Sequence, residues 1–315
     1  MFKITNRNTL ILSCGFAFIF SSSLASETVR TGEKRREIAF KEGLNWMLQH
    51  PQRIEEHVEL YANELLFYYL MTERSKKEGE REFFRRIFLQ RLGQSDRFDF
   101  KMPASIYETC SYILILGLRK WSRKWRATEC QTDSMLHYHV RQDMLKNINL
   151  YRAHHPLELI FIDYVSRKFD MKLPPVSRSD FKWWIFLGVE DRGHGRSSDF
   201  REMNYYEILV AYHVTHVIFI DSDYGLKYLD TRSYSKEYQY ILRNMEKFIS
   251  NNHIDLVSEF LICLRILRAT DTPAFKKGIA CVIGSQNDDG SWPKNIYSLN
   301  NKHTTIVSLW ALRED

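Results

Sequence analysis

The sequence lacks the short motifs that mark several common classes of enzyme. It contains no G-x-S-x-G, no H-E-x-x-H and no G-x-x-x-x-G-K-[ST]. Serine-hydrolase, zincin and P-loop nucleotide-binding functions are therefore disfavoured. None of the five cysteines forms a C-x-x-C pair, so a thiolate metal site has no support. An oxidising compartment would permit disulfides, but Cys110, Cys263 and Cys281 lie in apolar helical segments, where free buried cysteine is common.

Apolar runs long enough to span a bilayer, which takes about 20 residues, are missing too. The apolar stretch at residues 10–20 follows a basic start and precedes a small-x-small sequence at residues 23–25. This pattern predicts a secretory signal peptide over residues 1–25. An uncleaved N-terminal anchor is the alternative. We expect residues 26–315 to be one exported domain, periplasmic or secreted, that is not an integral membrane protein after signal cleavage.

A strong charge of one sign is absent. The net charge is +6, and the basic residues are spread along the chain. This distribution is typical of solvated helix faces rather than of a nucleic-acid groove. Export would also separate the protein from nucleic acid. We therefore expect no nucleic-acid partner.

Alternating strand patterns do not appear, and helical periodicity runs through almost the whole mature chain. Apolar residues recur every three or four positions in residues 38–48, 58–71, 83–92, 106–118, 157–169, 183–189, 208–220, 238–249, 254–267, 275–283 and 305–312. Ser105 and Glu108 have the spacing of a capping box, and Thr272 followed by Pro273 marks another helix start. The sequence therefore predicts an all-α fold of helical hairpins joined by short turns.

Two short sequences near the start of the mature chain recur near its end. Residues 39–44 resemble residues 274–279, and residues 57–60 resemble residues 253–256. Chance similarity is the alternative for matches this short. Repeated units bury their apolar faces only against neighbouring units. We therefore expect about six hairpins in a closed ring, with the first and last side by side.

The C-terminal part of the chain resembles a known superfamily. Residues 286–292 (QNDDGSW), followed by residues 303–312 (HTTIVSLWAL), are similar to a hairpin of the α/α-toroid proteins, which include terpenoid cyclases and protein prenyltransferases. Residues 212–225 resemble the T-H-x-x-F-x-x-x-D-[FY]-G segment of exported bacterial proteins of this kind, and Gly225 is expected to end that helix in a left-handed conformation. The resemblance covers about residues 200–312 and implies an α/α toroid.

The resemblance does not extend to isoprenoid chemistry. The Asp-x-Cys pair plus histidine that holds zinc in prenyltransferases is absent, and so is the D-x-D-D acid of squalene-type cyclases. Asp288 and Asp289 belong to a turn and do not replace that acid. The resemblance therefore implies a fold and leaves the reaction open.

Four residues are candidates for a site in the cavity of the predicted ring. His303 begins the last helix, His216 lies within residues 208–220, and Asp255 and Glu259 are four positions apart on one helix face. Inner helices of a ring begin around one mouth of its cavity, so these side chains are expected to converge. We predict that His303, His216, Asp255 and Glu259 form or border a catalytic site. In the alternative, these histidines are core residues and the carboxylates only favour a helix start.

Two kinds of chemistry fit these residue types. His303, His216 and Asp255 are suitable ligands for a divalent metal such as zinc, with an open position for water. The same groups form a metal-free acid–base pair equally well, because histidine titrates near neutral pH and a carboxylate orients it. A further candidate is the loop at residues 189–195, which carries charged residues and a histidine between glycines; its alternative is a polar connection between hairpins.

Two functions remain open. The first is an exported hydrolase or lyase that acts on an envelope glycan or a similar small molecule in the central cavity. The second is a non-catalytic protein that binds a peptide, a lipid or a partner protein, since aromatic residues make up 14% of the chain and suit an apolar pocket. Polar side chains that converge in the cavity would favour the enzyme, and a dry aromatic cavity would favour binding.

Overall fold

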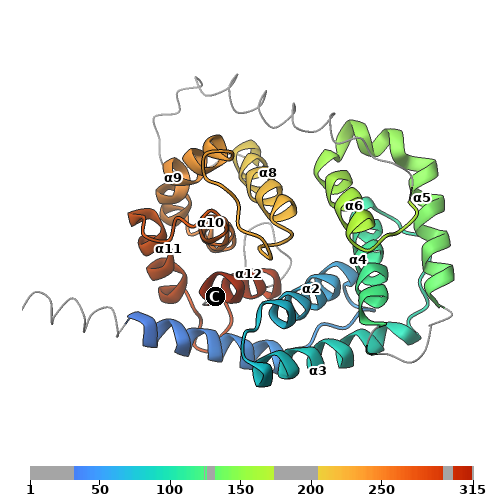
Figure 1. Cartoon of the computed structure of the whole chain (residues 1–315), viewed down its shortest axis with the longest axis horizontal. Coiled ribbons are helices and arrows are strands. Elements are labelled where there is room, and N and C mark those ends of the chain that lie inside the picture. The colour runs from blue at the N-terminus through green and yellow to red at the C-terminus, as the bar shows by residue number, and fades with distance from the viewer. Residues whose placement is uncertain (1–31, 124, 126–131, 174–204, 294–300, 314–315) are drawn as a thin grey trace, which may run out of the picture.

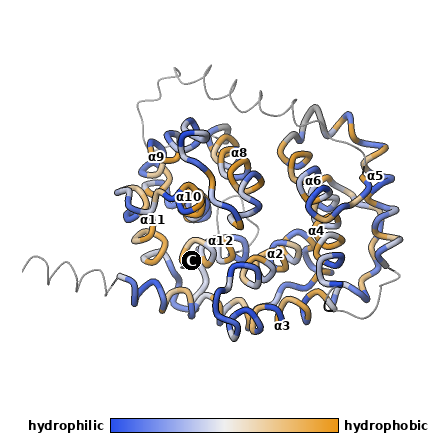
Figure 2. The backbone as a smooth tube through the Cα atoms, viewed as in Figure 1, coloured by the Kyte–Doolittle hydropathy of each residue, from blue (hydrophilic) through white to orange (hydrophobic). Residues whose placement is uncertain are grey.

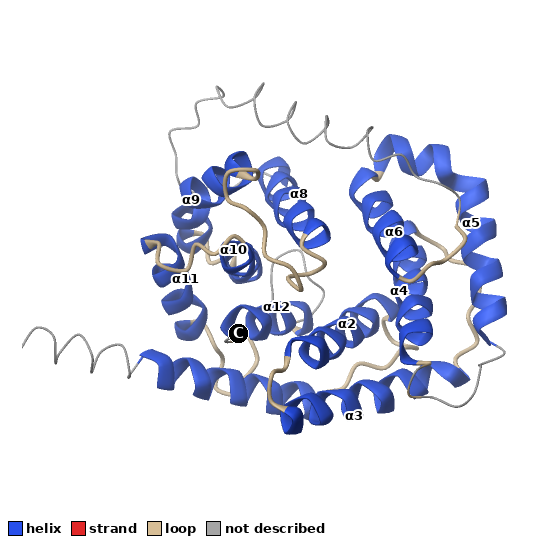
Figure 3. Ribbon diagram, viewed as in Figure 1, coloured by secondary structure: helices blue, strands red, loops and turns tan. Residues whose placement is uncertain are grey.

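The computed structural model describes residues 32–123, 125, 132–173, 205–293 and 301–313. All regular elements in these ranges are helical, which confirms the predicted all-α class (Figure 3). None of the described helices is long and apolar enough to cross a membrane. The predicted signal peptide at residues 1–25 and the candidate loop at residues 189–195 lie outside the described residues.

The helices follow one another along the chain with short connections. A helix over residues 32–49 comes first. It is followed by α2 (Val58–Arg74), α3 (Glu78–Gln94), the short η1 (Ser95–Arg97), α4 (Ile106–Ser122), α5 (Thr132–His154), α6 (Pro156–Lys168), α8 (Tyr205–Asp221), α9 (Ser235–Ser250), α10 (Ile254–Ile266), α11 (Pro273–Gly284) and α12 (Lys302–Leu312). Every predicted segment within the described ranges overlaps one of these helices, and residues 183–189 lie outside them.

One helix, α5, has no counterpart among the predicted segments. Its buried side chains Leu136, Val140 and Met144 recur only every fourth position, and mostly polar or exposed residues fill the positions between them. Such a narrow apolar stripe is enough for a helix that packs on one side only. Because α5 contacts α4 and α6 and is otherwise exposed, its sequence pattern is weak.

Six helices form a closed cycle of contacts, which we call the inner ring. Along it, α2 contacts α4, α4 contacts α6, α6 contacts α8, α8 contacts α10, α10 contacts α12, and α12 contacts α2 again. The helices between them in sequence, α3, α5, α9 and α11, pack around the outside (Figure 1). Alternate helices along the chain therefore face the centre of the molecule.

The hydropathy of each helix explains whether it lies in the inner ring or outside it. Every residue of α10 is buried, as expected of a helix that is apolar on most sides. In contrast, α9 buries one face, chiefly through Ile241, Met245 and Phe248. Figure 2 shows the same contrast between the mainly apolar α8 and the more hydrophilic α5. The sequence thus separates inner from outer helices by the width of their apolar faces.

Contacts between the two ends of the described chain close the ring. Gln286 Nε2 donates to the backbone oxygen of Ala39 at 2.9 Å. Lys302 Nζ lies 3.1 Å from Glu64 Oε2, and Arg91 Nε lies 3.1 Å from Glu64 Oε1, with all three side chains buried. The prediction that the first and last hairpins lie side by side is therefore confirmed.

Local signals in the sequence also fix the last hairpin. Gly290 has φ of +89°, a conformation that favours glycine. Beyond it, the fully buried Trp292 donates its backbone N–H to Thr305 Oγ1 at 3.0 Å and its indole N–H to the backbone oxygen of Val282 at 2.7 Å. These bonds tie the turn to both α11 and α12, so the start of α12 is held in place. His303 is the second residue of that helix.

Candidate functional site

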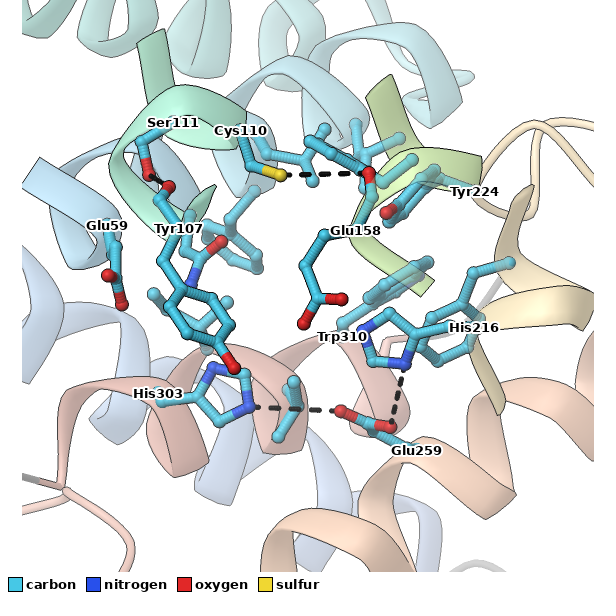
Figure 4. A pocket seen from close by; sticks show the side chains of 18 of the residues that line it. Glu59, Tyr107, Cys110, Ser111, Glu158, His216, Tyr224, Glu259, His303 and Trp310 are labelled. Atoms are coloured by element: carbon cyan, nitrogen blue, oxygen red, sulfur yellow. Dashed lines mark hydrogen bonds and ion pairs between the residues drawn. The ribbon is translucent and has the colours of Figure 1, made fainter. Parts of the chain in front are cut away.

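A cavity of about 240 Å³ lies inside the inner ring. All six inner helices contribute side chains to it (Figure 4). The polar lining residues are Glu59, Asn63, Tyr107, Cys110, Ser111, Glu158, His216, Tyr224, Glu259 and His303. The apolar lining residues are Leu66, Phe67, Leu70, Leu157, Phe161, Phe219, Ile306, Val307 and Trp310. The cavity is thus a mixed site with polar groups set against an apolar wall.

Stacked aromatic rings form part of that wall. The ring centroids of Phe219 and Trp310 are 5.0 Å apart, and those of Tyr224 and Trp310 are 6.1 Å apart with nearly parallel planes. Trp310 is 5% exposed, and its indole N–H has no hydrogen-bond partner among the described residues. Gly225 has φ of +77°, as predicted, but Asp223 and Tyr224 adopt left-handed conformations as well. This run turns the ring of Tyr224 toward Trp310.

Glu259 of α10 lies between two histidines from different helices. Its Oε1 atom is 3.8 Å from His303 Nε2, and its Oε2 atom is 3.9 Å from His216 Nδ1. Thr215 Oγ1 also donates to Oε2 at 2.5 Å. The Glu259 side chain is only 2% exposed, whereas each histidine side chain is 29% exposed and lines the cavity. The carboxylate therefore lies within ion-pair distance of both imidazole rings.

Hydrogen bonding sets the tautomer of His216. Its Nδ1 atom is 2.8 Å from the backbone oxygen of Tyr212. A carbonyl oxygen only accepts, so Nδ1 carries the proton. In the neutral ring Nε2 then has the free lone pair, and Figure 4 shows this second nitrogen turned toward the interior of the cavity. His216 is thereby arranged as a proton acceptor.

The environment of His303 favours its charged form. Burial lowers the pKa of His303, but the nearby Glu259 carboxylate, together with the charge of Asp255, outweighs burial and raises this pKa above its usual value of 6.5. His303 is therefore more fully protonated near neutral pH than a histidine in water. Since its exposed edge faces the cavity, it is arranged as a proton donor.

Asp255 lies behind the cavity and does not line it. It is fully buried, with Oδ1 2.7 Å from His253 Nδ1 and Oδ2 accepting a hydrogen bond from the hydroxyl of Tyr212. Burial raises the pKa of Asp255, but the bonds from His253 and Tyr212 and the charges of His253 and His303 hold it below its usual value. Asp255 thus borders the site as a charge that supports His303.

The predicted metal site is not formed by the described residues. No three His, Cys, Asp or Glu side chains in the described ranges are placed so that they could hold one metal ion. The physical reason lies in Asp255, whose two oxygens are already bound by His253 and Tyr212 while His216 and His303 face Glu259. Glu259, rather than Asp255, is the carboxylate that lies next to both histidines.

The lining residues that the sequence did not predict include Glu59, Tyr107, Cys110 and Glu158. They come from α2, α4 and α6, and no motif links them. Burial raises the pKa of Glu59; the charge of His57 partly offsets this, and the charge of Glu108 adds to it. Burial also raises the pKa of the Cys110 thiol well above its usual value, so this cysteine is protonated and a poor nucleophile. Cys110, Cys263 and Cys281 are all free.

The neighbouring histidine of the same helix takes no part. His213 Nδ1 is bonded to the backbone oxygen of Leu209 at 2.6 Å, and the residue does not line the cavity. Burial lowers the pKa of His213, which favours its neutral form. His213 is therefore a structural residue of α8.

Comparison with known families covers the same part of the chain. A family model described as "Domain of unknown function (DUF6895)" matches residues 201–308. The match includes His216, Glu259 and His303, and it nearly coincides with the residues whose motifs resemble the toroid proteins. Neither the curated proteins nor the solved structures yielded a match to this chain.

Proposed function

We propose that the protein is an exported enzyme of the α/α-toroid type whose active site is the cavity of the inner ring. The reaction would be hydrolysis or elimination on an envelope glycan or a similar small molecule. One observation carries this proposal: two histidines from different helices face one cavity and share the buried carboxylate of Glu259. A site in which a carboxylate orients imidazole rings is suited to general acid–base catalysis.

The two histidines have different roles in this proposal. His216 Nε2 accepts a proton, from water in a hydrolysis or from a carbon atom in an elimination. His303, with its raised pKa, gives a proton to the leaving group. A raised pKa suits a proton donor, and an imidazole whose Nδ1 is bound to a carbonyl oxygen presents Nε2 as the acceptor. Glu259 keeps both rings oriented and stabilises the charge on His303.

The toroid assignment and the cellular location are parts of the same proposal. The closed cycle of inner helices, with further helices outside, supports an α/α toroid of about six hairpins. The basic, apolar and small-x-small sequence of residues 1–25 supports export. An experimental structure and the N-terminal sequence of the mature protein would test these two parts separately.

A non-catalytic binding protein for a peptide, lipid or partner protein is the second candidate. The stacked rings of Phe219, Tyr224 and Trp310 favour it, because aromatic walls suit tight binding of apolar groups. The buried carboxylate with two histidines favours the enzyme. The two candidates differ in whether a ligand leaves the cavity chemically changed.

The test compares wild type with His216→Gln and His303→Gln. Each purified protein is incubated with glycan fragments and small-molecule extracts of the cell envelope, and products are followed by mass spectrometry. We expect a product with wild type that both variants form at least about a hundredfold more slowly. Conversion at the same rate by both variants would reject the acid–base proposal. Unchanged ligands recovered from wild type would favour binding.

A further inference from the structure

Carboxylates outnumber strongly basic groups around the cavity. Three carboxylates, Glu59, Glu158 and Glu259, line it, and no lysine or arginine is among its described lining residues. The basic groups there are the two histidines, and both face the same carboxylate, that of Glu259. Glu59 and Glu158 are thus left without a strong positive partner in the cavity.

Each of these two carboxylates shows this imbalance. The Glu158 side chain is 18% exposed, and its Oε2 atom lies 3.8 Å from His155 Nδ1. Glu59 is partly buried, and burial raises its pKa; the charge of His57 offsets part of this effect, and the charge of Glu108 adds to it. Removing carboxylates from water without compensating charges is unfavourable. A positively charged ligand in the cavity would offset the unfavourable burial of both carboxylates.

The aromatic wall beside Glu158 also suits a cation (Figure 4). Trp310 stacks with Tyr224 and lies against Phe219. Aromatic faces attract ammonium groups, and tryptophan does so best. The buried indole N–H of Trp310, unpaired in the described part of the chain, would be satisfied by an oxygen atom of a ligand. Carboxylates and aromatic rings that line one cavity are the two elements of an ammonium pocket.

We infer that the cavity binds a small organic cation, an amine or quaternary ammonium group with a nearby oxygen acceptor. This inference names the substrate class of the proposed active site and therefore rests on that function. The volume of about 240 Å³ is below the roughly 300–1,000 Å³ of pockets for drug-sized ligands. The ligand is therefore a small molecule or the cationic end of a longer one.

Three probes of nearly equal shape separate charge from size. Choline is the cation, 3,3-dimethylbutan-1-ol is its neutral counterpart, and 3,3-dimethylbutanoate is the anion; ethanolamine and benzylamine extend the set of cations. Binding to the full mature protein is measured by calorimetry and by tryptophan fluorescence. We expect at least one cation to bind about tenfold or more tightly than the neutral alcohol. Added salt should lower the affinity for that cation and leave the affinity for the alcohol unchanged.

Variants identify the groups responsible. Glu158→Gln and Glu59→Gln should each weaken cation binding by about tenfold and leave binding of the neutral alcohol unchanged. Glu246→Gln removes an exposed carboxylate outside the cavity that pairs with Lys277 and serves as the control. Thermal unfolding identifies any variant that does not fold, and the probe series on wild type stands without the variants.

The inference is wrong if no cation binds, if the alcohol or the anion binds as tightly as the best cation, or if both glutamate variants retain full cation affinity. Failure here is distinguishable from failure of the proposed function. If His216→Gln still binds the cation and wild type forms no product, the inferred cation site stands and the proposed enzymatic function is rejected. If wild type converts a neutral or anionic substrate and binds no cation, the enzymatic function stands and the cation site is rejected.

Discussion

His303 Nε2 and Glu259 Oε1 lie 3.8 Å apart on adjacent helices of the inner ring, α12 and α10. This separation is too long for a strong hydrogen bond and short enough for an ion pair. The pair therefore influences protonation through charge, and it leaves the cavity-facing edge of His303 available to a ligand. Four measurements test how much this pair and its surroundings contribute.

The first prediction concerns pH and stability. Since the folded-state pKa of His303 is raised, its contribution to stability is complete below the unfolded pKa near 6.5 and is lost as pH rises through the folded pKa. Wild type should therefore exceed His303→Gln in free energy of unfolding by more at about pH 6 than at about pH 9. Urea denaturation of both proteins across this range is the measurement. A difference that grows with pH would contradict the assignment.

The second prediction concerns Glu259. Glu259→Gln keeps the shape of the side chain and an oxygen for Thr215 but removes the charge shared by His216 and His303. The pKa of His303 should fall, which two-dimensional NMR of the imidazole resonances can follow during a pH titration. Asp255→Asn should lower it less, because Asp255 makes the smaller of the charge contributions. Equal pKa values in wild type and Glu259→Gln would show that Glu259 does not control His303.

The third prediction concerns the closure of the ring. Glu64→Gln leaves Arg91 and Lys302 buried without their shared carboxylate and should lower the free energy of unfolding by about 3–5 kcal/mol. Lys302→Met should cost less, because Glu64 keeps Arg91 as a partner. Equilibrium denaturation gives both values. The reverse order of the two effects would mean that the carboxylate is not the centre of this network.

The fourth prediction concerns the contact between the first and last hairpins. A Cβ atom at Gly43 would come within 2.5 Å of a ring carbon of Trp292. Gly43→Ala should therefore destabilise the protein by about 1–3 kcal/mol through overpacking. At Gly79, in α3, nothing lies within 4 Å of such an atom, so Gly79→Ala should be neutral or stabilising by up to about 1 kcal/mol. Similar thermal midpoints for the two variants would contradict this packing.

Much of the site follows from the sequence because local patterns fix where helices begin. The Asp289-Gly290 turn and Trp292 fix where α12 begins, and this fixes the position of His303 at the start of that helix. The sequence also places Asp255 and Glu259 on one face of α10. It does not say which of them reaches the cavity, because they lie one turn apart and this depends on how α10 packs against its neighbours. The structure turns Glu259 toward the histidines and leaves Asp255 behind them.

Other parts were beyond prediction for a different reason. Glu59 and Glu158 lie about a hundred residues apart and line one cavity only after their helices have packed together, so no spacing in the sequence relates them. The helix α5 was missed because an outer helix needs only a narrow apolar stripe. Sequence patterns report local periodicity well, whereas the composition of a cavity shared by six helices depends on long-range packing.

The closure of the ring has a consequence for how the protein folds. Gln286 bonds to Ala39 across 247 residues of chain, and Lys302 bonds to the backbone oxygen of His50 across 252. Contacts so distant in sequence form late, because a long loop must close before they contribute. During synthesis the early helices therefore lack their partners, and Glu64 remains without Lys302. The cavity comes into existence only after α12, the last helix of the ring to be made, has joined α2.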